Sequence, residues 1–366
     1  MKRSQLDLRQ QVAQLIIMGV EGPELDGENV KTLTRLQPGG LILFARNITS
    51  AGQCYDLLRV GRRSTAVPMF TCVDLEGGMV DRFRELIGPA PSQAMVASTG
   101  SKAIFRKHGE VLGDEARSMG FNTDFAPVSD LAYESSKKVM GSRTASADPE
   151  GTIVYVREFL KGLNASGVIG CGKHFPGLGE ADLDTHFSLP EIARPLKDLW
   201  KHDLLPYRKL HRQFPFVMVA HCAYPAVTGD RKPASLSSKW MKDVLRKKIG
   251  YRGIVLADDL EMGGVLAVGT IQDAALECIR AGADMFLVCR KEEFVIATFE
   301  AVLHEAERNS KFAKLVREAC TRVIAEKKKQ KGLTKVAARP TEKTIARLRQ
   351  QLDTFKKQLE KAGATA

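Results

Sequence analysis

The sequence has 366 residues, of which 44% are hydrophobic and 27% charged, a composition typical of a soluble globular protein. The formal net charge of +12 is uneven, because +9 of it lies after residue 326 and only +3 in the other 326 residues. We expect no membrane insertion, a cytoplasmic location and no nucleic-acid role for the main domain, since the chain has neither an apolar span nor a signal peptide and its basicity is confined to the tail.

Short apolar runs recur eight times along the chain, at 15–20, 39–46, 69–75, 122–131, 167–175, 216–222, 253–259 and 284–289. They are rich in Val, Ile and Phe and bounded by Gly or Pro, which fits buried parallel strands. Helical candidates lie between them, such as 101–121, which Gly120 would end, and a segment that Ser237 would cap and Gly250 would end. Eight strands alternating with helices predict a (β/α)8 barrel. A doubly wound open sheet is less favoured, because no Gly-rich dinucleotide turn follows the first strand.

The pattern changes after Glu326, where a lysine-rich connector precedes a segment with apolar residues in steps of three and four. These residues are Ile345, Leu348, Leu352, Phe355 and Leu359. The sequence therefore predicts a catalytic domain at 1–326 and a basic linker with an amphipathic helix at 327–366. The helix would lie across the barrel or against a partner subunit, so we expect a monomer or a homodimer formed through this helix.

Seven cysteines are dispersed along the chain without any CxxC pair. This spacing indicates neither a disulfide framework nor a zinc knuckle, and we expect buried, reduced thiols. The sequence indicates no cofactor and no metal site.

Ionisable residues follow five of the predicted strands, where they would share the carboxyl face on which barrel enzymes carry their active sites. They are Asp74 and Glu76, Arg143, Lys173 and His174, His221, and Asp258 and Asp259. Any one of them alone would be read as a solvated loop residue, but their convergence on one face indicates an active site.

Asp258 ends a buried strand, so its carboxylate could attack an electrophilic carbon or stabilise a cation. Asp259 should point to the other face and bond loop backbone, because neighbouring strand residues alternate. The stretch KHFPGLGEADLDTHFSLP at 173–190 places Asp184 two residues before His186, so the carboxylate could orient the imidazole for acid/base catalysis. Its glycines and prolines would let it close over a substrate. Alternatively, Asp184 caps a turn and His186 is a surface histidine.

The same stretch resembles the K-H-F-P-G-H-G-x(4)-D-S-H signature of bacterial β-N-acetylhexosaminidases of glycoside hydrolase family 3, the NagZ type. VDLEGGMVDRF, MGSRTASADP and GYRGIVLADDLEMGG are similar to three further motifs of that family, in the same order. The chain departs from the motifs where Leu178 replaces a histidine, Leu75 a glutamine and Met79 an arginine, and where Ala145 and Ser146 replace Phe and Gly.

The resemblance implies a (β/α)8 barrel that hydrolyses terminal β-linked N-acetylglucosamine with retention, from peptidoglycan-derived saccharides. Matched position by position, it implies Asp258 as nucleophile and His186, paired with Asp184, as acid/base. It implies sugar binding by four further residues, Asp74, Arg143, Lys173 and His174. The usual retaining pair is two carboxyl groups, so a histidine acid would be an exception.

Four alternatives remain open from the sequence. They are a β-N-acetylglucosaminide phosphorylase, a β-glucosidase, a non-catalytic sugar-binding barrel, and a metal-dependent hydrolase using His174, Asp184, His186 and His221. The last is not favoured, because the histidine spacing matches no metal-binding signature.

Overall fold

The computed structural model describes residues 6–25, 27–178, 189–267 and 269–365. Eight parallel strands form its centre, in the order β4-β3-β2-β1-β8-β7-β6-β5. They are β1 (Ile16–Met18), β2 (Gly40–Ile42), β3 (Phe70–Val73), β4 (Thr123–Asp124), β5 (Cys171–Phe175), β6 (Phe216–Val219), β7 (Ile254–Asp259) and β8 (Met285–Val288). Each predicted run holds one strand, so this part of the prediction is confirmed.

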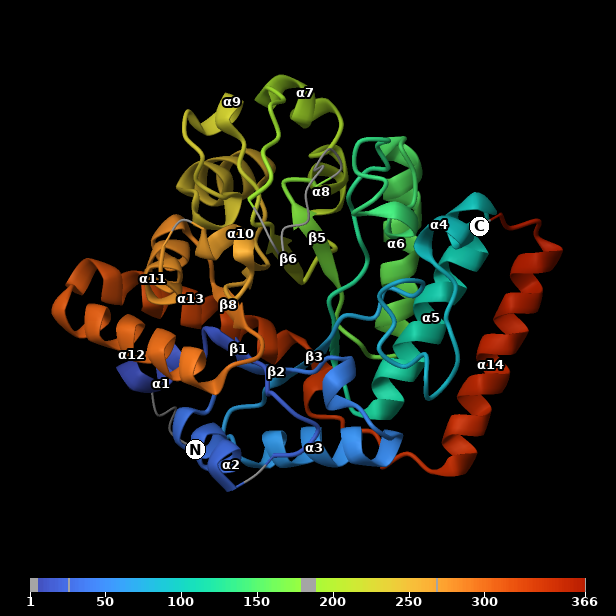
Figure 1. The fold of residues 1–366 in the computed structure, drawn as a ribbon, viewed down its shortest axis with the longest axis horizontal. Coiled ribbons are helices and arrows are strands. Elements are labelled where there is room, and N and C mark those ends of the chain that lie inside the picture. The colour runs from blue at the N-terminus through green and yellow to red at the C-terminus, as the bar shows by residue number, and fades with distance from the viewer. Residues whose placement is uncertain (1–5, 26, 179–188, 268, 366) are drawn as a thin grey trace.

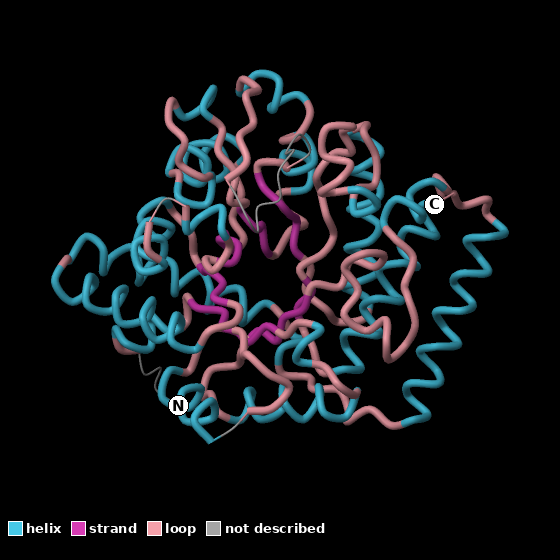
Figure 2. Tube along the Cα trace, in the orientation of Figure 1, coloured by secondary structure: helices cyan, strands magenta, loops and turns pink. Residues whose placement is uncertain are grey.

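The strands close into a ring, which Figure 2 shows in magenta. Isolated bridges next to β4 and β5 complete it, with Thr123 paired to Ile169 and Val128 paired to Lys173. The predicted (β/α)8 barrel is therefore confirmed.

Helices surround the ring (Figure 1). The longer ones are α2 (Gly27–Leu36), α3 (Ala51–Arg63), α5 (Lys102–Met119), α6 (Pro149–Ala165), a π-helix (Lys239–Ile249), α11 (Ile271–Ala281), α12 (Glu292–Arg308), α13 (Ser310–Lys329) and α14 (Glu342–Lys361). The shorter ones are α1 (Leu8–Ala13), α4 (Gln93–Ser98), α7 (Leu196–Lys201), α8 (Leu205–Leu210), α9 (Pro225–Thr228) and α10 (Gly263–Leu266). Among the described segments, no helix is both long enough and apolar enough to cross a membrane.

Local sequence explains where the helices begin and end. The Ser101 hydroxyl accepts from the Ile104 amide at the start of α5, and Gly120, at φ 100°, ends it as predicted. Gly250 likewise ends the π-helix at φ 83°. The predicted cap at Ser237 is wrong by one position, because the helix starts after Ser238, which makes no side-chain cap. The reason is local, since Ser237 lies at the end of a preceding 3-10 turn.

Two hydrophobic layers hold the barrel. Side chains inside the ring, including Phe70, Phe125 and Phe216, form the inner core, and Val323 and Leu333 pack against them. A larger outer cluster lies between strands and helices. All seven cysteines are buried and none forms a disulfide, as expected.

The C-terminal segment packs onto this barrel. Helix α13 continues to Lys329, so the predicted boundary after residue 326 falls inside a helix. Helix α14 lies beside α5 at the outer edge of the molecule (Figure 1). Its predicted apolar stripe is buried, with all five residues at most 7% exposed. The stripe therefore faces α5 within the same chain.

Candidate active site

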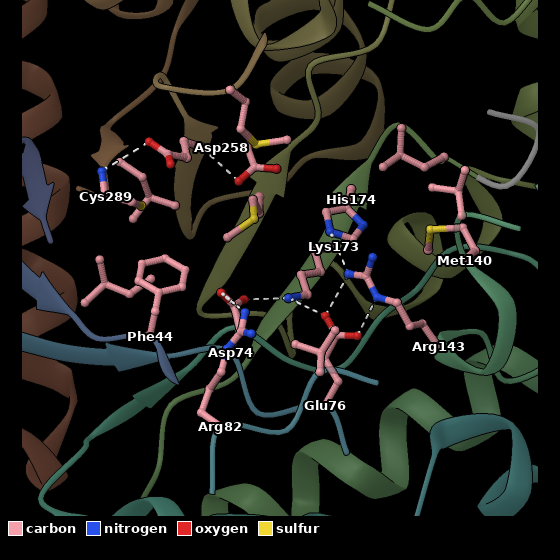
Figure 3. Close-up of a pocket in the computed structure, with 18 residues that line it drawn as sticks. Phe44, Asp74, Glu76, Arg82, Met140, Arg143, Lys173, His174, Asp258 and Cys289 are labelled. Carbon is pink, nitrogen blue, oxygen red and sulfur yellow. Dashed lines mark hydrogen bonds and ion pairs between the residues drawn. The ribbon is translucent and has the colours of Figure 1, made fainter. Parts of the chain in front are cut away.

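A pocket opens at the carboxyl ends of the strands (Figure 3). Its polar lining consists of Asp74, Glu76, Arg82, Arg143, Lys173, His174, Asp258 and Asp259. Its apolar lining includes Phe44, Val80, Val139, Met140, Leu178 and Met262. With its open mouth it encloses about 830 Å³, in the range of small-molecule sites.

The structure brings together the five described residues that the sequence singled out for the site. Asp74 follows β3, Arg143 ends a 3-10 turn (Gly141–Arg143), Lys173 and His174 belong to β5, and Asp258 belongs to β7. In Figure 3, Asp258 faces the pocket from one side, and the other four lie across from it. The other two predicted residues, Asp184 and His186, lie outside the described residues.

Asp74, Glu76, Arg143 and Lys173 form one side of the pocket, called here the charged wall, and Glu76 lies at its centre. It accepts hydrogen bonds from Arg143 Nε and Nη2, both at 2.8 Å, and lies 2.7 Å from Lys173 Nζ. Lys173 Nζ also donates to Asp74 Oδ1 at 2.7 Å. Because paired donors and acceptors of this kind fix one geometry, Arg143 and Lys173 are held in place before any ligand binds.

The charges in this wall stabilise one another. Burial alone would raise the pKa of Glu76, but Arg143 and Lys173 outweigh it and hold that pKa well below its usual range. Burial alone would lower the pKa of Lys173, but Asp74 and Glu76 raise it above its ordinary value. The wall therefore keeps two anions and two cations at neutral pH.

Asp130 holds the neighbouring histidine, and sequence reasoning missed it. Its Oδ2 lies 2.7 Å from His174 Nδ1 and accepts the His174 backbone N–H at 3.1 Å. Its Oδ1 accepts the Leu178 N–H at 2.7 Å. With Nδ1–H donated to this carboxylate, Nε2 of His174 is left facing Arg143 at 3.5 Å. Asp130 thus orients the ring and fixes the start of the segment that follows β5.

The paired acids at the end of β7 differ in their surroundings. Asp258 Oδ1 accepts the Asp259 N–H at 2.8 Å. Asp259 Oδ1 accepts the backbone N–H groups of Glu261 and Cys289 at 3.1 and 3.2 Å, which confirms the predicted bonds to loop backbone. The prediction that Asp259 points to the other face is wrong, because both acids line the pocket where the strand is irregular between Ala257 and Asp259. Burial raises the pKa of Asp259 to about 7. Asp258 therefore accepts fewer backbone hydrogen bonds from the described residues than Asp259, one against two.

Other residues named from the sequence lie apart from this wall. His221 is buried, and its ring bonds Ser235 Oγ and the Asp259 carbonyl. Within the described residues, no group of three or more His, Cys, Asp or Glu side chains is arranged to hold a metal ion. Three residues depart from the family motifs by replacing a histidine, a glutamine and an arginine. Of these, Leu178 lines the pocket, Leu75 is buried, and Met79 is 63% exposed.

Comparison with known families finds one match over most of the chain. The model of the glycosyl hydrolase family 3 N-terminal domain matches residues 7–325. A beta-hexosaminidase of Idiomarina loihiensis is 34% identical over 303 residues, covering 82% of this chain and 90% of the relative. A beta-hexosaminidase of Pseudomonas aeruginosa is 35% identical over 275 residues, which cover 75% of this chain and 82% of the relative.

Solved structures give the same result. A glycoside hydrolase family 3 β-N-acetylglucosaminidase from Paenibacillus sp. superimposes with a TM-score of 0.88 at 28% identity, covering 96% of this chain and 69% of that one. Native NagZ from Neisseria gonorrhoeae gives a TM-score of 0.74 at 27% identity, covering 96% and 98%. The similarity therefore includes the whole barrel and the strand ends that carry the pocket.

Proposed function

The chain belongs to glycosyl hydrolase family 3, and from that membership we propose that it is a retaining exo-hydrolase that releases terminal β-linked N-acetylglucosamine. The observation that carries the proposal is the pocket, in which Asp258 faces a wall of paired charges. We propose peptidoglycan-derived saccharides as the natural substrates. The curated relatives are named beta-hexosaminidases, which supports the choice of an acetamido sugar.

In the proposed reaction, a carboxylate oxygen of Asp258 forms a bond to the anomeric carbon while the glycosidic C–O bond breaks. His186, protonated and oriented by Asp184, gives its proton to the departing oxygen. In the second half, neutral His186 takes a proton from water, the water oxygen bonds to the anomeric carbon, and Asp258 is released. Two inversions give net retention.

The charged wall would bind the sugar opposite Asp258. Asp74 and the His174 Nε2 can accept from sugar hydroxyl groups, and Lys173 and Arg143 can donate to them. Because these side chains are already held by Glu76 and Asp130, little ordering cost remains when the sugar binds.

The test is release of p-nitrophenol from its β-N-acetylglucosaminide and its β-glucoside, each with and without phosphate. We expect turnover of the acetamido sugar, independent of phosphate, and a β-anomer as first product by proton NMR. Phosphate-dependent release of a sugar 1-phosphate would establish the phosphorylase instead. Preference for the glucoside would establish a β-glucosidase.

Two variants test the residue roles. Asp258→Asn and His186→Ala should each lower kcat at least about 1,000-fold while circular dichroism shows a folded barrel. Activated aryl leaving groups need little protonation, so His186→Ala should lose less on dinitrophenyl than on alkyl glycosides. Unchanged turnover in Asp258→Asn would refute the proposed nucleophile.

A further inference from the structure

Helix α14 lies beyond the stretch matched by the family model, which ends at residue 325. It packs outside α5, on the side of the barrel where residues 74–92 connect β3 to α4 (Figure 1). This connection, called here the β3 loop, carries Asp74 and Glu76 of the pocket wall.

Helix α14 contacts the β3 loop directly. Arg349 Nε and Nη2 donate to the Leu86 carbonyl at 3.0 and 2.7 Å. Leu352 lies against Gly88, where an added Cβ would meet its Cδ2 at 3.7 Å. Past the loop, the Thr365 N–H donates to Ser98 Oγ at 2.9 Å at the end of α4. The segment after Glu76 is thus held from outside at successive points.

A second route runs through α5. The Phe355 ring stacks on His108 with centroids 5.7 Å apart. Nδ1 of His108 lies 2.7 Å from the Tyr155 hydroxyl, so the ring is fixed. Its Nε2 faces the β3 loop, where a Cβ on Gly77 would approach it to 3.2 Å. His108 therefore packs between α14 and the turn that follows Glu76 and limits how far that turn can move.

The turn after Glu76 has little side-chain packing of its own, so neighbouring elements must hold it in place. Gly77 and Gly78 have φ values of 79° and 59°, a conformation that favours glycine, and they bring no side chains of their own to pack. The turn is held by backbone bonds, from Gly78 N–H to the Ala90 carbonyl at 3.0 Å and from Glu76 N–H to the Val80 carbonyl at 2.9 Å. A shift of the β3 loop would therefore move Glu76, and with it its partners in the wall.

We propose that α14 is a positioning element for the active site, with Arg349 and Phe355 as its positioning residues. By holding the β3 loop, it keeps Glu76 where Arg143 and Lys173 are aligned to bind the sugar. The catalytic consequence rests on the proposed function, whereas the bracing of the loop does not.

The first test compares Arg349→Ala with Arg347→Ala. Both arginines are exposed on α14, but Arg347 donates to Gln351 on α14 and to Ser118 on α5, rather than to the β3 loop. Because displaced binding groups hold the sugar less tightly, we expect Arg349→Ala to lower kcat/KM about 3- to 10-fold, mainly by raising KM. Arg347→Ala should match the wild type, and Arg349→Lys, which keeps one donor, should recover part of the loss.

The second test needs no turnover. Hydrogen exchange followed by mass spectrometry should show faster exchange at 77–92 in Arg349→Ala and in Phe355→Leu, and unchanged exchange in Arg347→Ala. Unchanged exchange at 77–92 in both α14 variants would overturn the proposal that α14 holds the β3 loop. Faster exchange with unchanged kcat/KM would overturn its link to catalysis. If the wild type hydrolyses no glycoside, the proposed function fails, and the exchange data still decide the brace.

Discussion

Glu76 accepts more hydrogen bonds from the wall than any of its neighbours there, although the sequence placed it only among the ionisable residues at the strand ends and gave it no role of its own. Its position two residues after Asp74 was visible, but its partners lie 67 and 97 residues further along the chain. Long-range pairing of this kind follows from the closed barrel and leaves no local pattern. The roles of Asp74, Arg143, Lys173 and His174 came from motif resemblance, whereas the role of Glu76 comes from contacts.

Replacing Glu76 by Gln should damage the wall in a way that can be measured. The amide nitrogen cannot accept from Arg143 or Lys173, so the buried Lys173 and the partly buried Arg143 lose part of their charge compensation. We expect the free energy of unfolding in urea to fall by about 3–5 kcal/mol. We also expect kcat/KM to fall by more than about 10-fold.

The chain provides a control in which the two cations reach solvent. Glu158 bonds Arg106 and Lys161, again one carboxylate with one guanidinium and one ammonium, but these two partners are about half exposed. Glu158→Gln should therefore change stability by at most about 1 kcal/mol and leave turnover unaltered. Equal losses in the two variants would contradict the special position of Glu76.

Asp259 gives a pH dependence of known sign. Burial raises the pKa of its carboxyl from the ordinary aspartate value of 3.8 to about 7, so the protonated form is favoured in the folded state. Its contribution to stability is therefore full below about pH 4 and is lost as the pH rises through about 7. Asn at this position cannot ionise and keeps an oxygen to accept from Glu261 and Cys289.

We accordingly expect the wild type to lose more stability between pH 5 and pH 8 than Asp259→Asn does. Urea unfolding at both pH values measures this difference. Parallel losses in the two proteins would show that Asp259 does not titrate in this interval.

At the scale of elements, Asp130 connects the segment after β4 to β5 and to the start of the segment beyond it. Asp130→Asn keeps the size of the side chain but places an amide beside the His174 N–H groups. Hydrogen bonds to charged groups are worth about 1.5–3 kcal/mol, so we expect kcat/KM to fall about 10- to 100-fold. Steady-state kinetics on the aryl acetamido sugar measure this.

The control for Asp130 lies on the same β4–α6 connection. Asp148 caps α6 by accepting from the Gly151 N–H at 2.8 Å, and Asn caps helices as well as Asp. Asp148→Asn should keep wild-type kinetics. A loss in this control equal to that in Asp130→Asn would mean that the connection tolerates no change and that Asp130 has no specific role.

The strands could be predicted because each lies within a short, largely apolar run, and such a run can be recognised without knowledge of its distant contacts. Helix ends at Gly120 and Gly250 followed from the same local chemistry. The place of α14 could not be predicted, because an apolar stripe shows that one face is buried but not what covers it. Asp130 was missed for a similar reason, since its partner His174 is 44 residues away.

At the scale of the whole molecule, the burial of the α14 stripe bears on oligomerisation. The five stripe residues pack within one chain, and among the described residues only Met79, Leu266 and Val336 are large, apolar and exposed. These three lie on separate segments of the sequence, and scattered apolar residues do not make an interface. Of the two states expected from the sequence, a monomer is the one we now predict.

Light scattering coupled to gel filtration should therefore give a mass near 40.3 kDa that does not change with concentration. Leu352→Asp provides the contrast, because a buried charge should detach α14 and expose both the stripe and the face of α5 beneath it. That variant should self-associate as its concentration rises, while the matched exposed change Gln350→Asp should not. A wild-type dimer that Leu352→Asp dissociates would mean that the stripe joins two chains, and that α14 holds the β3 loop of a partner rather than its own.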